Sequence, residues 1–164
     1  MRPEGYAHLC EMIKDLDFAM LTTVSEDGSL HSRPMSTQQI DSDRAELWFF
    51  TSIDSPKVEE IYHERTVGLS YASPSKNNYV SVSGRAYVVR DTDKAAELWT
   101  PFLKAWFPQG LNDPHIALLR VVIESAQYWD SPSSKVVQLW GLAKVMLTGN
   151  PPKNVGENVK INLR

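Results

Sequence analysis

Hydroxyl and ammonium side chains gather at the start of one predicted helix. Thr51 and Ser52 end an apolar run, and Ser55 and Lys57 follow shortly after. The first N–H groups of a helix have no partner within the helix, and the helix dipole is positive there, so this position favours an anion. A lysine in the first turn is unfavourable by the same dipole unless an anion lies beside it. The pattern predicts an anion site; a capped surface helix with a solvated lysine is the alternative.

Arg33 is the second cation that could take part in this site. It lies in a predicted strand with Pro34 and Met35, and antiparallel pairing could bring it beside the run Phe49–Thr51. A guanidinium can bind phosphate through two parallel hydrogen bonds, which suits arginine to a phosphate group. An edge-strand arginine paired with a carboxylate is the alternative, and Pro34 fits an edge strand. Together the two segments predict a phosphate clamp beside an aromatic strand.

Several other chemistries lack their motifs in this sequence. There is no Gly-x-Gly-x-x-Gly or Gly-Lys-Ser/Thr for a nucleotide phosphate, and no Gly-x-Ser-x-Gly for a nucleophilic serine. The histidines and the single Cys10 show no metal-ligand spacing, so we predict no metal site. A formal net charge of −3 argues against a nucleic-acid partner and against a polybasic membrane contact.

The chain of 164 residues fits one domain, and its apolar runs predict mostly strands. Asp27-Gly28 is a typical hairpin turn between the first two. The predicted strands are Phe18–Val24, Leu30–Met35, Glu46–Thr51, Thr66–Tyr71, Tyr79–Val89, Leu118–Ile123 and Ala126–Trp129. The predicted helices are Tyr6–Leu16, Ser55–His63, one from Asp91 or Thr92 to Trp99, and Ser133–Thr148. Hairpin-linked strands with a few helices indicate a mainly β fold, an antiparallel β-barrel with helices.

We expect a single domain over residues 1–150, ending in the helix Ser133–Thr148, and a mobile tail over residues 151–164, which lack periodicity. No apolar segment reaches the ~20 residues that span a bilayer. Charged residues between Glu4 and Asp17 interrupt any signal-peptide core. A single cysteine forms no disulfide within the chain. These features predict a cytoplasmic protein that does not associate with a membrane.

A series of short motifs carries a family resemblance. They are Phe18–Val24 with Asp27-Gly28, Ser32–Met35, Leu47–Ser52 with Ser55–Val58, Tyr79–Ala86, Trp106–Gly110 with Asp113-Pro114, and Tyr128–Asp130. By these motifs the chain resembles the FMN-binding split β-barrel superfamily of pyridoxamine 5′-phosphate oxidase-like proteins, most closely its bacterial general stress protein branch. The resemblance implies a six-stranded antiparallel Greek-key split barrel of the FMN-binding type. It also implies a homodimer with flavin at the subunit interface.

The resemblance implies which residues hold FMN. The implied ligands of the phosphate are Arg33, Thr51, Ser52, Ser55 and Lys57. The strand positions implied to line the isoalloxazine ring are Pro34, Met35 and Phe50. The residues implied to reach the flavin across the subunit interface are Tyr79 and Trp129. FMN joins an anionic phosphate to a flat, mostly apolar ring, so its site needs donors at one end and apolar walls at the other. Trp106 is expected in the core or in a dimer contact.

Three functions stay open at this point. The first is a general stress protein acting as an FMN-dependent oxidoreductase, with NAD(P)H or another small molecule as its substrate. The second is an FMN-binding protein without turnover, a flavin buffer or redox sensor. The third is a haem- or deazaflavin-binding barrel, because one fold can host several cofactors. The chain lacks the C-terminal arginine and histidine pair with which the oxidase proper grips its substrate, so we expect no oxidation of pyridoxamine 5′-phosphate. No catalytic residue is assigned.

Overall fold

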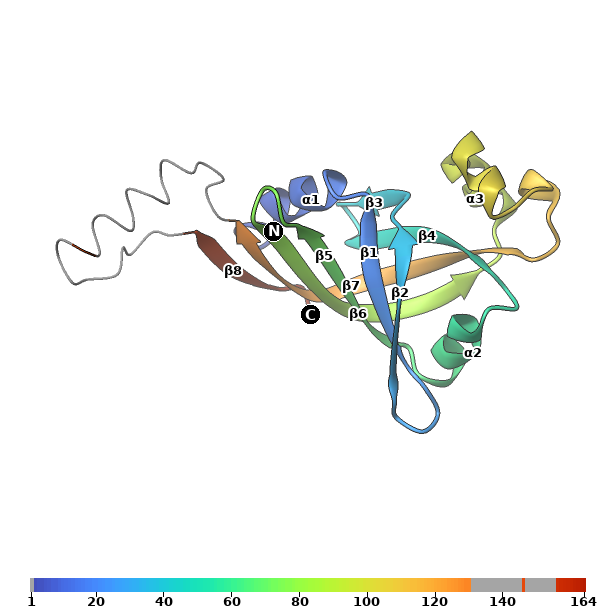
Figure 1. Cartoon of the computed structure of the whole chain (residues 1–164), viewed down its shortest axis with the longest axis horizontal. Coiled ribbons are helices and arrows are strands. Elements are labelled where there is room, and N and C mark those ends of the chain that lie inside the picture. Colours follow the sequence, from blue (N-terminus) through green and yellow to red (C-terminus); the bar gives the residue numbers. More distant parts are fainter. Residues whose placement is uncertain (1, 131–145, 147–155) are drawn as a thin grey trace.

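The computed structural model describes residues 2–130, 146 and 156–164, which form one antiparallel sheet with helices around it (Figure 1). The strands are β1 (Phe18–Val24), β2 (Leu30–Ser36), β3 (Gln39–Asp41), β4 (Glu46–Ser52), β5 (Thr66–Ser73), β6 (Asn78–Val89), β7 (Ile116–Asp130) and β8 (Glu157–Asn162). The helices are α1 (Tyr6–Lys14), α2 (Pro56–His63), α3 (Thr92–Leu98) and the short 3-10 helices η1 (Pro101–Ala105) and η2 (Gly110–Asn112). The predicted mainly β antiparallel class is confirmed.

The sheet is curved, and the short connection between β2 and β3 links its two edges. Its strand order is β2-β1-β5-β6-β7-β4-β3, with β8 added on β7. β2 and β3 lie at opposite ends of this order but follow each other in sequence, and between them Gln38 N donates to Trp48 O at 2.8 Å. The segment from β2 to β3 therefore bends from β1 across to β4 and closes one end of a barrel. The structure describes eight strands: six of them match the seven strands predicted from the apolar runs, since two of the predicted ones form β7, and β3 and β8 were not predicted.

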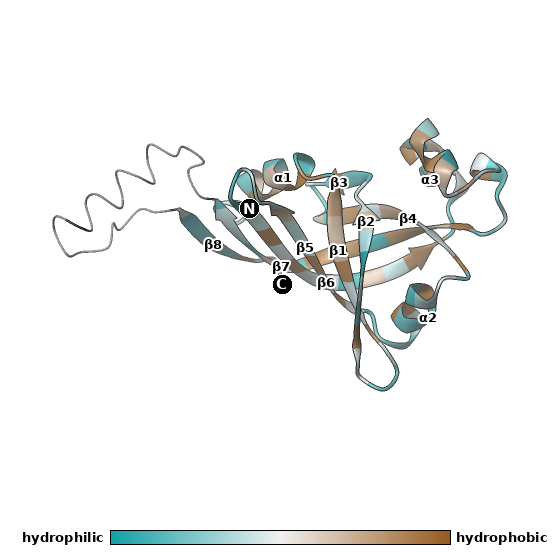
Figure 2. Ribbon diagram, in the orientation of Figure 1, coloured by the Kyte–Doolittle hydropathy of each residue, from teal (hydrophilic) through white to brown (hydrophobic). Residues whose placement is uncertain are grey.

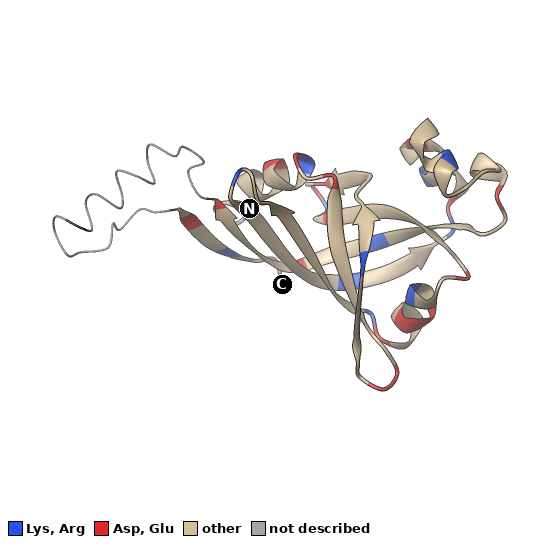
Figure 3. Ribbon diagram, viewed as in Figure 1, with Lys and Arg blue, Asp and Glu red and all other residues tan. Residues whose placement is uncertain are grey.

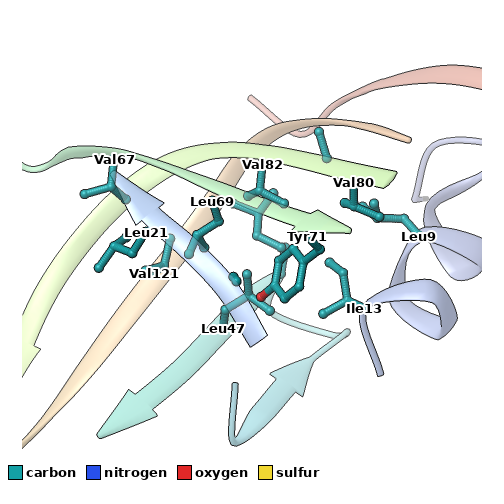
Figure 4. Packing of buried hydrophobic residues seen from close by; sticks show 14 of the residues in the cluster. Leu9, Ile13, Leu21, Leu47, Val67, Leu69, Tyr71, Val80, Val82 and Val121 are labelled. Carbon is teal, nitrogen blue, oxygen red and sulfur yellow. The ribbon is translucent and has the colours of Figure 1, made fainter. Parts of the chain in front are cut away.

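Alternating side chains build the core inside this curved sheet. In β1, Ala19, Leu21 and Thr23 are buried, whereas Phe18 and Met20 face outward. The buried sets of β5, β6 and β7 alternate in the same way, as the period of a strand requires. The helix α1 covers the core near the start of β1, with its apolar face directed at the sheet, as Figure 4 shows for Leu9 and Ile13. Cys10 is buried beside them, and burial raises the pKa of its thiol.

The connection from β6 to β7 forms a second, smaller cluster of apolar residues. The buried Ala95 and Leu98 of α3 and Leu103 of η1 pack with Phe107 on Trp48 and Phe50 of β4 and Leu118 of β7, and Figure 2 shows apolar stretches in these two strands. Phe50 of β4 meets Trp99 edge to face with ring centroids 5.8 Å apart, and it meets Phe107 at 6.2 Å. Asp91 accepts a hydrogen bond from the Lys94 N–H at 2.9 Å and caps α3, which confirms the predicted start of that helix. The cluster fixes η1 beside the end of β4.

The last third of the chain departs from prediction. The expected strands Leu118–Ile123 and Ala126–Trp129 are one strand, β7, with a register shift between them. The expected tail over residues 151–164 is wrong for Glu157–Asn162, which form β8, pair with the end of β7 and bury Ile161 in the core. The predicted helix Ser133–Thr148 lies outside the described residues, apart from Met146. Within the described ranges, no helix is long and apolar enough to cross a membrane.

Candidate binding site

A cavity of about 360 Å³ lies where β2, β4, α2 and η1 meet. Its volume falls in the range of small-molecule sites. Seven of the ten residues proposed from the sequence line it, and they are Arg33, Pro34, Met35, Phe50, Thr51, Ser52 and Lys57. The other lining residues are Phe18, Ser36, Gln38, Leu103, Trp106 and Phe107. The structure thus brings the β2 and β4–α2 segments together, as the clamp hypothesis requires.

Hydroxyl and ammonium groups form one end of the cavity. Lys57 Nζ donates to Thr51 Oγ1 at 3.2 Å, and that hydroxyl lies 3.3 Å from Ser55 Oγ. Ser55 holds the N-cap position of α2, as expected, but its side chain makes no capping hydrogen bond. Its hydroxyl lies beside Thr51, and Ser55 does not itself line the cavity. Pro56 occupies the first turn of α2, where its missing N–H costs little.

The Lys57 ammonium is half-buried, and Glu60, the negative charge that acts on it, lies beyond salt-bridge distance. In the part of the chain that the structure describes, no carboxylate oxygen lies within 4.0 Å of Lys57 Nζ. Burial lowers the pKa of this ammonium, and the nearby positive charge of Arg33 lowers it further. A cation held in this way is stabilised by an anion that enters the cavity.

Arg33 faces the cavity and pairs with a carboxylate at the same time. Its Nη2 donates to Glu60 Oε2 at 3.0 Å, and its Nη1 donates to Thr23 Oγ1 and, at 3.5 Å, to Leu21 O. A guanidinium has five N–H donors, so these contacts leave donors for a ligand. Arg33 therefore pairs with a carboxylate and still lines the cavity, so the pairing does not exclude the clamp.

Glu60 is a site residue that the sequence analysis missed. Burial alone would raise the pKa of its carboxyl, but hydrogen bonds from Thr23, His31 and Ser25 and the charge of Arg33 outweigh burial and lower the pKa to about 2. The carboxylate is therefore ionised at neutral pH. One sequence signal existed: Glu60 follows Lys57 by three residues, about one helical turn. Figure 3 shows both signs of charge close together on α2.

Apolar and aromatic side chains line the rest of the cavity. Leu103, Trp106 and Phe107 come from η1 and the residues after it, and they line the cavity together with Phe50 and Met35. Trp106 is 56% exposed and meets Phe102 edge to face at 5.1 Å, so it does not pack in the core of this chain, and its expected dimer contact stays a prediction. This end offers flat apolar surfaces, as a planar aromatic ring requires.

Tyr79 and Trp129 lie elsewhere in the chain. They face each other across β6 and β7 and point away from the core, with exposed fractions of 40% and 37%. Neither lines the cavity. Ala72 of β5 pairs with Tyr79, and Phe18 of β1 lies beyond it on the same outer face, so these four residues form one apolar row across the sheet. Since Phe18 also lines the cavity, the row starts at the cavity mouth.

Two features define the class of this protein. It is an antiparallel barrel, and its small-molecule cavity is cationic at one end and aromatic at the other. The family model described as "Pyridoxamine 5′-phosphate oxidase like" matches residues 4–153. The chain belongs to that family, which confirms the resemblance drawn from its motifs.

Individual relatives agree with this assignment. Protein bli-3 of Neurospora crassa is 31% identical over 143 residues, which cover 82% of this chain and 68% of that protein. The crystal structure of the general stress FMN/FAD binding protein from Xanthomonas citri is 32% identical, with a TM-score of 0.69 over 80% of this chain and 92% of that one. A Clostridium acetobutylicum protein related to general stress protein 26 matches at a TM-score of 0.71 and 17% identity, covering 98% of this chain and 95% of its own. That third similarity supports the split-barrel fold alone.

Proposed function

We propose that this protein binds FMN and acts in the cytoplasm as a flavin-dependent oxidoreductase of a small molecule, with NAD(P)H as the electron donor. The observation that carries the proposal is that Arg33 and Lys57 lie together at one end of an aromatic cavity, and that Lys57 has no carboxylate within salt-bridge distance in the described part of the chain. The binding named for the relative from Xanthomonas citri supports it. The finer fold belongs to the same proposal: a six-stranded Greek-key barrel, counting β2 and β3 as one bent strand and β8 as an addition.

The donor set of the cavity fits FMN. Arg33 and Lys57 would bind the phosphate oxygens, and the hydroxyls of Thr51, Ser52 and Ser55 would donate further hydrogen bonds. The isoalloxazine ring would lie against Pro34, Met35 and Phe50. A bound flavin supplies the redox chemistry, whereas the protein orients it and excludes water.

A flavin buffer or redox sensor without turnover is the second candidate, and one observation favours it. Arg33 and Lys57 are the only titratable side chains among the described residues that line the cavity, so this chain supplies no carboxylate or imidazole there to move a proton. Hydride transfer to a flavin depends more on how the donor is oriented than on an acidic side chain of the protein. The lack of such a side chain is therefore compatible with an enzyme. A haem ligand would need an axial side chain, and the described lining offers Met35 alone.

The absorbance spectrum of the purified protein tests the cofactor, and a reduction assay tests the activity. We expect a flavin spectrum, bleached by NADH or NADPH without oxygen and restored by air. A flavin spectrum that neither nucleotide bleaches would support the buffer, and a haem or empty spectrum would overturn the proposal. Pyridoxamine 5′-phosphate added to the flavin-loaded protein in air should form no aldehyde at an ordinary enzyme rate of about 1 per second.

We also propose that the chain forms a homodimer, with Tyr79 and Trp129 reaching the partner's flavin. The support is the apolar row of Phe18, Ala72, Tyr79 and Trp129, which lies outside this chain's own core and begins at its cavity. Exposed aromatic residues in a continuous row are typical of interaction surfaces.

Sedimentation at low micromolar concentration tests the dimer. We expect twice the 18.5 kDa mass of the chain for the unchanged protein and a shift to monomer for Trp129→Glu, because a carboxylate would be buried in the interface. Tyr62→Glu is the matched control, since Tyr62 is an exposed aromatic residue on α2, outside the row. An unchanged protein that is monomeric and still holds FMN would contradict the shared site.

A further inference from the structure

Glu60 lies at the centre of a partly buried polar cluster that connects α2 to the β1–β2 hairpin. Its Oε1 is 2.6 Å from His31 Nδ1 and accepts a hydrogen bond from Ser25 Oγ at 3.1 Å. Its Oε2 accepts from Thr23 Oγ1 and, at 3.0 Å, from Arg33 Nη2. We call these five residues the Glu60 cluster. The Glu60 side chain is only 11% exposed, and protein donors contact both of its carboxylate oxygens.

The cluster holds Arg33 in one orientation. Glu60, Thr23 and the Leu21 carbonyl contact the two Nη atoms, which fixes one edge of the guanidinium plane. A free arginine side chain loses rotamer entropy when it binds a ligand. An arginine that is already held loses less of that entropy, so a ligand binds it more tightly. The contacts lie on the protein side, whereas Arg33 still lines the cavity.

The same carboxylate connects the two cationic segments of the site. Arg33 belongs to β2, and Lys57 lies in the first turn of α2, one helical turn before Glu60. Arg33 and Lys57 are both positively charged, so they repel each other. Glu60 is attracted to both of them and fixes the helix against the hairpin. Glu60 therefore helps to set the spacing of the two cations, in addition to the buried Val58 and Ile61 that pack α2 on the barrel.

We propose that Glu60 is a positioning residue for anion binding: it holds the Arg33 guanidinium, and the helix that carries Lys57, in the arrangement that receives a phosphate. This inference rests on the proposed function, because the phosphate is that of FMN. Glu60 itself does not contact the ligand.

A purely electrostatic role predicts the opposite result, and this makes the inference testable. A carboxylate close to a phosphate repels it, so removing the charge of Glu60 would tighten FMN binding if charge were all that mattered. If Glu60 acts by positioning Arg33, removing its charge weakens FMN binding although the repulsion is also removed. The sign of the change separates the two roles.

The experiment measures FMN and riboflavin affinity by flavin fluorescence for the unchanged protein, Glu60→Gln, Glu60→Asp and Glu59→Gln. We expect Glu60→Gln and Glu60→Asp to weaken FMN binding by about five- to twentyfold, a range centred on the tenfold change that corresponds to ~1.4 kcal/mol. Glu60→Asp keeps the charge but shortens the side chain, so its loss would be one of geometry. Riboflavin, which has no phosphate, should change by less than twofold. Glu59 is exposed on the same helix, and Glu59→Gln should change neither affinity.

A second background shows whether Glu60 acts through Arg33. In the Arg33→Ala protein, Glu60→Gln should cause a clearly smaller loss of FMN affinity than in the unchanged protein, because only its effect on the helix that carries Lys57 remains and the removed repulsion opposes that loss. An unchanged or tighter FMN affinity of Glu60→Gln in the unchanged background overturns the inference, and so does an equal loss for riboflavin. If the unchanged protein binds riboflavin and FMN equally, or neither, the phosphate site of the proposed function fails, which is a separate result.

Discussion

Replacing Arg33 by alanine is expected to lower the affinity for FMN by about ten- to a hundredfold. Arg33 lines the cavity and keeps N–H donors free beside its contacts with Glu60 and Thr23. Hydrogen bonds to charged groups contribute roughly 1.5–3 kcal/mol, and each ~1.4 kcal/mol is a tenfold change in affinity. Lys57→Ala should cause a loss of similar size, because the ammonium of Lys57 has no carboxylate partner within the described residues.

Riboflavin separates loss of the phosphate contact from loss of the fold. It shares the ring of FMN but lacks the phosphate, so both variants should bind it almost as well as the unchanged protein. Arg44→Ala is the matched control for removing a guanidinium, because Arg44 is highly exposed and lies outside the cavity. Equal losses for FMN and riboflavin would show that Arg33 and Lys57 are structural and that the clamp is wrong. The measurement is a fluorescence titration of each flavin at constant ionic strength.

The cationic half of the site could be predicted because its information is local. Thr51, Ser52, Ser55 and Lys57 lie close together in the sequence, and the physics of a helix N-terminus gives that spacing a meaning. Glu60 could not be assigned in the same way. It lies 27 residues from Arg33 and 37 from Thr23, so its role exists only after α2 has packed on the hairpin.

The aromatic wall depends on tertiary packing as well. Trp106 and Phe107 follow a 3-10 helix with no hydrophobic period of its own, and their place beside the cavity is set by the contact of Phe107 with Phe50. Their residue types fit a core equally well. The sequence therefore predicts that these residues are apolar contacts but not which surface they form.

The strands show the same division between local and non-local information. β1 has the predicted bounds, because its apolar run is bounded by Asp17 and by the turn at Asp27-Gly28. β3 has three residues, too few for a period to be detected. In β7 the polar pair Glu124-Ser125 resembles a loop between two strands. The structure instead has Ser83 opposite Ser125 and Gly84 opposite Ile123, so Glu124 is the extra residue of a β-bulge.

That bulge makes Gly84 the position where one added methyl group should have the largest effect on stability. A Cβ at residue 84 would overlap the carbonyl oxygen of Val122 and lie 3.1 Å from its carbonyl carbon. Both atoms belong to the backbone of β7, which is bonded to β4 and β6 on either side and cannot move aside alone. We expect Gly84→Ala to lower the free energy of unfolding by about 3 kcal/mol, the upper end for overpacking. For a chain of this size that corresponds to a melting temperature roughly 10 °C lower.

Gly68→Ala is the matched control, since Gly68 lies on the neighbouring strand β5. The nearest atoms to a Cβ there are Val82 O at 3.9 Å and Thr22 Cβ at 4.0 Å, which is ordinary contact. We expect that variant to be as stable as the unchanged protein or more stable by about 0.4–1 kcal/mol, because alanine restricts the unfolded chain. Thermal and urea unfolding of both variants give the comparison. Equal stability of the two would mean that β7 shifts freely at its bulge, and the close approach of β6 and β7 would then not be the reason for a glycine at position 84.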